Sequence, residues 1–207
     1  MEKLQKIKSF DDLSEKCSTW IIKYNSTTFD KSLFFVWYTD TDEKSTDRLL
    51  TYNDGKIFAV KSLIDLNKTL KAEIVNLTKF DNLIVWLDNL KNYKIVESCS
   101  YNLISVINNL DKNILDNTDL EDFANFINLY EDFINQDLRN KKLQVNSDNE
   151  LIKKAWNYYY DNIFWPRFND KEKFYNLERP KLEIDTKKLL EKFKVLIATF
   201  EDNIKLK

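Results

Sequence analysis

A short acidic sequence directly follows the most apolar run of the chain. Asp40 and Asp42 are separated by one residue, and Glu43 comes next, in the order Asp-Thr-Asp-Glu. Two carboxylates at the end of a strand can share one hard cation such as Mg²⁺. Lys44 follows the acids at once, however, and the chain has little glycine for a close approach to phosphate. A solvated loop and a partner-binding loop are therefore alternatives to a metal site here.

The composition excludes several other kinds of site. The 207 residues include no His, one Gly and two Pro, which rules out His metal ligands, Ser-His-Asp triads and glycine-rich phosphate loops. Cys17 and Cys99 are far apart in the sequence and read as reduced thiols. No pair of carboxylates stands out as a general acid and base. We therefore expect neither an enzyme nor a bound cofactor.

Acidic residues are concentrated in one part of the chain. The formal net charge is −2 and the pI is near 5.4, which argues against nucleic-acid or membrane binding by bulk charge. Residues 111–137 nevertheless hold eight acidic side chains and one lysine. A solvated helix face would explain this stretch, and a docking surface for a basic partner is the alternative. The candidate docking residues here are Asp116, Asp119, Glu121 and Asp122.

A dense aromatic cluster lies between Trp156 and Phe168, in the sequence WNYYYDNIFWPRF. Trp156, Tyr160 and Phe164 repeat every four residues, which is typical of a helix face packed in a core. A protein-binding hot spot and a stacking platform for single-stranded nucleic acid are the alternatives. Tyr158 falls off the apolar face, so we expect it to be exposed and available to a partner.

The elements that must position these residues follow from apolar spacing, caps and turns. In the first part of the chain we expect a helix that begins after Ser9 and continues to Tyr24, a buried strand at 32–39, a hairpin over 48–61 that turns at Asp54-Gly55, and a helix from 63 to 77. The remainder is predicted to be mainly helical, with segments at 80–90, 100–110, 120–133, 151–163 and 186–200 and a possible strand at 93–97. The segment from 168 to 184 has no clear periodicity and is expected to be a long surface connection.

These elements predict an α+β fold with an N-terminal helix and a small antiparallel sheet of three or four strands, packed with a helix-rich C-terminal part. We expect one compact domain over residues 1–207, with an α-β-β-β-α portion at 1–77 and a mainly helical portion at 78–207. The chain has neither a signal peptide nor a run of about 18 apolar residues. We therefore expect a cytoplasmic protein that spans no membrane.

In general character the chain resembles the immunity proteins of bacterial polymorphic and contact-dependent toxin systems. The resemblance depends on an acidic α+β chain rich in Asn, Lys, Ile and aromatic residues, with segments such as SLFFVWYTD, RLLTYNDGKIFAVKS and AWNYYYDNIFWPRF, and no catalytic set. It implies a binding inhibitor that neutralises one cognate toxin, often a basic nuclease, and it assigns no individual residues.

Three hypotheses follow for function. The first is an immunity protein that steers onto a basic toxin domain through the acids of residues 111–137 and through Asp40, Asp42 and Glu43, with aromatic residues such as Tyr158 as anchors. The second is a regulatory interaction domain, for instance from a mobile element. The third is a metal-dependent enzyme that uses Asp40 and Asp42. The sequence leaves the oligomeric state open.

Overall fold

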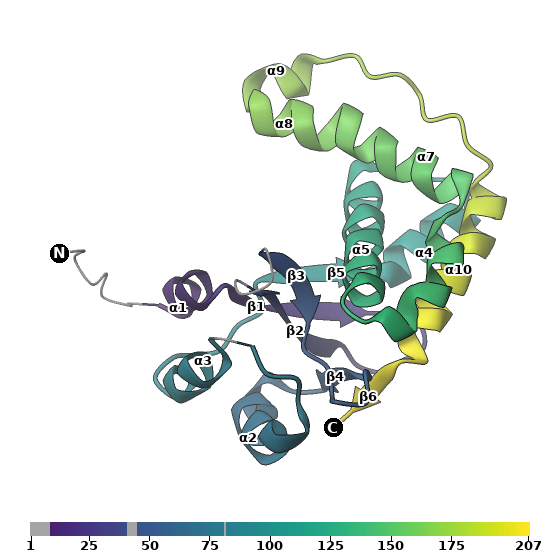
Figure 1. Cartoon of the computed structure of the whole chain (residues 1–207). Coiled ribbons are helices and arrows are strands. Elements are labelled where there is room, and N and C mark those ends of the chain that lie inside the picture. Colours follow the sequence, from purple (N-terminus) through teal and green to yellow (C-terminus); the bar gives the residue numbers. More distant parts are fainter. Residues whose placement is uncertain (1–8, 41–44, 81) are drawn as a thin grey trace. The chain divides into compact units, whose positions relative to one another are not determined.

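The computed structural model describes residues 9–40, 45–80 and 82–207 and has an α+β fold, so the predicted class is confirmed. The chain divides into two compact units, shown in Figure 1. Unit 1 comprises the residues up to Ser100 together with Asn203–Lys207, and unit 2 comprises Tyr101–Asp202. The division thus falls near residue 100, whereas the sequence placed a subdivision after residue 77. None of the helices in the described ranges is both long and apolar enough to cross a membrane.

Unit 1 is built on a sheet of six strands, in the order β5-β1-β2-β4-β6, with β3 also paired to β2. The strands are β1 (Thr19–Asn25), β2 (Leu33–Asp40), β3 (Thr46–Leu49), β4 (Ile57–Val60), β5 (Cys99–Asn102) and β6 (Ile204–Leu206). The prediction of three or four strands was therefore too low. One added strand, β6, comes from the far end of the chain and pairs parallel with β4, which local periodicity does not reveal.

The first helix is shorter than the sequence suggested. α1 (Phe10–Cys17) begins at Ser9 with the capping box that Asp12 completes, but it ends at Ser18, whose φ of 46° is left-handed. β1 then pairs antiparallel with β2. The helical spacing of Trp20, Ile21 and Tyr24 was misleading, because a strand buried on both faces also carries closely spaced apolar residues.

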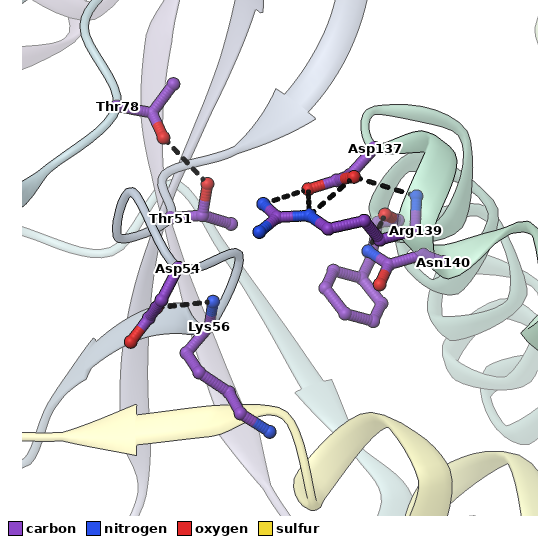
Figure 2. Close-up of polar contacts among 8 residues, drawn as sticks. Thr51, Asp54, Lys56, Thr78, Asp137, Arg139 and Asn140 are labelled. Atoms are coloured by element: carbon purple, nitrogen blue, oxygen red, sulfur yellow. Dashed lines mark hydrogen bonds and ion pairs between the residues drawn. The ribbon is translucent and has the colours of Figure 1, made fainter.

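The predicted hairpin is confirmed. Gly55 has a φ of 86°, and its amide donates to the carbonyl of Tyr52 over 2.8 Å. The Asp54 carboxylate closes the turn by accepting from the amide of Lys56 (3.0 Å), as Figure 2 shows. The hydroxyl groups of Thr51 and Thr78 form a hydrogen bond of 3.1 Å. This bond links the hairpin to the segment around Thr78.

Helices cover one face of the sheet in unit 1. These are α1, α2 (Leu63–Glu73) and α3 (Leu83–Leu90), with the short η1 (Ile74–Asn76) after α2. Their apolar faces share a core with alternate residues of the strands, including Val36 of β2 and Val60 of β4. Trp86 of α3 is fully buried in this core. Residues 93–97 form no strand, so that possibility was wrong.

Unit 2 is a helical assembly centred on α5 (Asn117–Asn135). The long helices beside α5 are α4 (Leu103–Asp111), α7 (Glu150–Tyr159) and α10 (Thr186–Glu201), and the shorter segments are η2 (Leu138–Leu143), α6 (Gln144–Ser147), α8 (Trp165–Asn169) and α9 (Lys171–Asn176). Aromatic rings interlock between α5 and α10, where Phe126 meets Phe193 and Phe200 edge to face with centroids 5.5 Å apart. Edge-to-face pairs of this kind stabilise a core beyond the area they bury.

The helix that was expected to end near Pro166 continues past it. A π-helical turn (Tyr160–Phe164) joins α7 to α8, and Pro166 lies in the first turn of α8. The wider turn accommodates a residue that has no amide hydrogen and would clash with a regular helical turn. The aromatic segment therefore runs on to Asn169 as helix.

Candidate protein-binding site

Two acids of the acidic stretch, Asp119 and Asp122, are buried inside unit 2, whereas Asp111 and Asp116 are exposed. Asp119 is 1% exposed and completes a capping box with Asp116 at the start of α5. Its carboxylate also accepts from Ser105 Oγ (2.9 Å) and Asn109 Nδ2 (2.8 Å) of α4. Asp119 therefore holds α4 against α5 and is closed to a partner, so its placement in a docking surface was wrong.

Asp122 is likewise buried, with 8% of its surface exposed. The pKa of its carboxyl is raised to about 6, mainly by burial; a backbone hydrogen bond from Asn102 lowers it, and the nearby charges of Glu121, Asp119 and Asp116 contribute to the rise. A group with this environment takes part in the packing of α5, and its proposed role as a contact residue was also wrong.

The other acids near α5 are mostly paired. Glu121 binds the guanidinium of Arg167 through two hydrogen bonds of 2.9 and 3.1 Å. Asp137 binds Arg139 in the same two-pronged manner (Figure 2), and these bonds lower the pKa of Asp137. Asp116 is exposed but serves as the N-cap of α5. Glu121 and Asp137 are thus paired with arginines, while Asp111 and Asp116 remain exposed to a partner.

The second acidic candidate is described only in part. Asp40 ends β2 and forms an ion pair with Arg48 of β3, with 3.3 Å between the two groups. An arginine at this distance competes with a cation for the carboxylate. Asp42 and Glu43 lie outside the described residues. Within the described ranges, no three His, Cys, Asp or Glu side chains are placed to hold a metal ion.

Tyr158 is half-buried rather than exposed, and it lies in the wall of a groove. Its hydroxyl donates to the carbonyl of Pro180 over 2.8 Å. The groove has a volume of about 760 Å³ and lies within unit 2, between the start of α5, Tyr158 of α7 and the extended segment that joins α9 to α10. Its volume is within the range of ligand sites, roughly 300–1,000 Å³.

Exposed aromatic side chains gather at α8 and α9. Trp165, Phe168 and Tyr175 are 48%, 73% and 72% exposed, and the neighbouring Leu177 is 50% exposed. We call these four residues the aromatic patch. Trp165 and Phe168 contact each other with ring centroids 5.9 Å apart, and both contact Phe164. Trp165, Phe168 and Tyr175 are the exposed aromatic residues in the described part of the chain.

The patch has a rigid base. Behind it, Asn128 of α5 accepts a hydrogen bond from Trp156 Nε1 (2.8 Å) and donates to the hydroxyl of Tyr160 (2.7 Å). The Arg167–Glu121 pair fixes α8 to α5 on the same helix. Because α7 and α8 are fixed in this way, the backbone that carries Trp165 and Phe168 loses little conformational freedom on binding, which favours a contact surface.

Only part of this site could be predicted from the sequence. The aromatic cluster at 156–168 was predicted to be core, with a protein-binding hot spot as an alternative. In the structure some of its residues are buried and others are exposed. Tyr159 and Ile163 are buried, whereas Trp165 and Phe168 are exposed. Tyr175 and Leu177 were missed, because they lie in the stretch 168–184, where the apolar spacing has no clear periodicity.

Comparison with known proteins supports the fold and leaves the function open. The chain is similar to the crystal structure of the SatS C-terminal domain in complex with bromine, with a TM-score of 0.60 and 12% sequence identity. The likeness covers 95% of this chain and 97% of that chain. No family model and no curated protein matches the sequence. At this identity the likeness concerns the fold alone, so the function has to be argued from side chains.

Proposed function

We propose that the protein is a protein-binding inhibitor of the immunity type, which neutralises a cognate toxin by binding it through the aromatic patch. The observation that carries the proposal is the exposure of Trp165, Phe168 and Tyr175 on a rigid helical base. Large aromatic residues supply most of the energy at protein interfaces and are costly to leave in water. The resemblance in composition to immunity proteins supplies the kind of partner.

The proposal changes the expected charge of the partner. From the sequence we expected the partner to be a basic toxin domain, attracted by the acids of residues 111–137. Since Asp119 and Asp122 are buried and Glu121 is paired with Arg167, only part of the acidic stretch, including Asp111 and Asp116, is left to steer a basic partner. An aromatic contact of this kind instead predicts an interaction that depends weakly on salt.

Affinity capture tests the proposal. The tagged protein is used as bait in its native cells, and the bound proteins are quantified by mass spectrometry. We expect one stoichiometric partner that is lost with the double variant Trp165→Ala/Phe168→Ala. Ile64→Ser is the matched control, because Ile64 of α2 is 92% exposed and lies outside the patch.

The inhibitor role is tested on the captured partner. Expression of its gene alone is expected to arrest growth, and co-expression of the wild-type protein, but not of the double variant, is expected to restore it. A partner that is harmless when expressed alone would contradict the immunity role. Capture that survives the double variant would place the interface elsewhere.

A further inference from the structure

The segment between α9 and α10, residues 177–184, is extended; we call it the strap. Figure 1 shows it as a long trace that joins the two helices. Its two ends are tied to unit 2 by side chains: Arg179 donates to Asn117 Oδ1 (3.3 Å) and stacks over the ring of Phe174, and after the strap Thr186 donates to Asn113 Oδ1 (2.8 Å). In between, the carbonyl of Pro180 accepts from Tyr158.

The strap has the side-chain pattern of a strand. Leu182 and Ile184 are half-buried, whereas Lys181 and Glu183 are exposed, so burial alternates with the period of two that strands have. Leu182 packs against the cluster formed by α5, α7 and α9. The strap is therefore held in extended form by its side chains, without support from neighbouring backbone.

Beyond Leu177, whose amide donates to the carbonyl of Phe174, the strap makes no backbone pairing with the described parts of the chain. Among the described residues, no backbone–backbone hydrogen bond involves residues 178–184. A half-buried extended segment with free amide and carbonyl groups is an open edge on which another extended chain can pair. Ordinary edge strands are shielded by pairing or by a covering element, and the strap instead borders the groove.

The groove next to the strap suits an extended polypeptide. Its apolar wall includes Leu115, Leu120 and Leu182, and its polar wall includes the amides of Asn113 and Asn117. Side-chain amides both donate and accept, as peptide groups do. An added strand would place every second side chain against the leucines. The lining is thus matched to a chain that carries alternate apolar residues. Its charged residues are Arg179, Lys181 and Glu183, so the excess of one positive charge favours an acidic chain.

The geometry points to β-augmentation: the strap accepts an extended segment of the partner protein as an additional strand. This inference rests on the proposed function, because it specifies how the same partner is held beside the aromatic patch. The aromatic residues would supply the anchor, and the backbone pairing would supply the direction and register of the bound segment.

Amide exchange and a peptide library test the inference without the captured partner. In the free protein, NMR should find that the amides of residues 181–184 exchange rapidly. Random 12-residue peptides displayed on phage are then selected on the full chain. We expect enriched peptides with alternating apolar residues, and we expect a bound peptide to protect alternate strap amides, either 181 and 183 or 182 and 184, as pairing along one edge requires.

Proline variants separate backbone pairing from side-chain contact. Glu183→Pro removes an amide hydrogen from one edge of the strap and Leu182→Pro removes one from the other, while Glu183→Ala and Leu182→Ala keep both. We expect one proline variant to weaken the selected peptide about tenfold or more relative to its alanine control. Protection of the strap amides in the free protein, a library that yields no enriched peptide, or proline variants that equal their controls would overturn the inference.

The proposed function and the strap site can fail independently of each other. If peptides pair with the strap but capture gives no partner, the proposed function fails and the strap site stands. If a partner is captured through the aromatic patch and its affinity is unchanged in both proline variants, the strap site fails and the proposed function stands.

Discussion

The acidic stretch of α5 and the aromatic segment of α7 to α9 have the opposite exposure to the one their compositions suggest. Acids are usually solvated and aromatic rings are usually buried. Here Asp119 and Asp122 are buried, while Phe168 and Tyr175 are largely exposed. The difference arises from the place of each helix: α5 is at the centre of unit 2, and α8 and α9 lie at one end of it, as Figure 1 shows. Position in the assembly outweighs composition.

The comparison is sharpest for two neighbours in the sequence, Phe174 and Tyr175. Phe174 is 5% exposed and packs in the cluster below the strap, whereas Tyr175 is 72% exposed. We expect Phe174→Ala to lower the free energy of unfolding by about 3 kcal/mol, because it leaves a cavity. Tyr175→Ala should change it by less than about 0.5 kcal/mol. Urea unfolding measures the free energy of unfolding of both variants. Equal losses would contradict the burial of Phe174 and the exposure of Tyr175.

The buried acid at the start of α5 gives the next largest effect. Asp119→Ala removes the capping box, takes the acceptor from the Ser105 hydroxyl, and leaves Asn109 Nδ2 with only the long contact of 3.4 Å to Ser105 Oγ. We expect a loss of about 2 kcal/mol in the free energy of unfolding, from the cap and the unsatisfied donors together. Asp111→Ala, at the exposed end of α4, is the control and should be close to neutral. Comparable losses of unfolding free energy in the two variants would contradict the role of Asp119 as a buried cap.

Asp122 gives a smaller effect of opposite sign that depends on pH. Its pKa of about 6 in the folded protein is above the ordinary value of 3.8, so the folded protein holds the proton more tightly than the unfolded chain. Ionisation therefore reduces stability progressively as the pH rises from about 4 to about 6, and the loss is complete above that range. We expect Asp122→Asn to be up to about 2 kcal/mol more stable than the wild type at pH 7.5.

At pH 4.5 most of this advantage should disappear, because Asp122 in the folded wild type is then largely protonated. Urea unfolding of the two proteins at both pH values measures the difference. A gain that is the same at pH 4.5 and pH 7.5 would mean that the carboxyl is not desolvated.

Much of the fold could be predicted, because its signals are local. Caps at Ser9, Ser62 and Asp185 and the turn at Gly55 mark elements that the structure contains. The misses depend on distant partners. β1 has helical spacing and becomes a strand because β2 pairs with it, and β6 exists only because the chain returns to β4.

The site was less predictable than the fold. Whether Asp119 is a surface charge or an internal cap depends on α4, whose Ser105 and Asn109 meet it. Trp165 carries no mark that distinguishes it from the buried Tyr159, since both belong to one aromatic segment. The exposed Trp165 and Phe168 lie in α8, which continues the helix beyond the segment that holds the buried Tyr159 and Ile163, and Pro166 gives no sign in the sequence that the helix continues.

The most direct test of the central claim is a calorimetric titration of the captured partner against three versions of the protein: the wild type, Trp165→Ala/Phe168→Ala, and the charge-reversal variant Asp111→Lys. Asp111 is an exposed member of the acidic stretch. If the aromatic patch is the interface, the aromatic variant should lose about a hundredfold or more in affinity, while the charge-reversal variant changes only a few-fold. A large loss in the charge-reversal variant with an unaffected aromatic variant would contradict the claim.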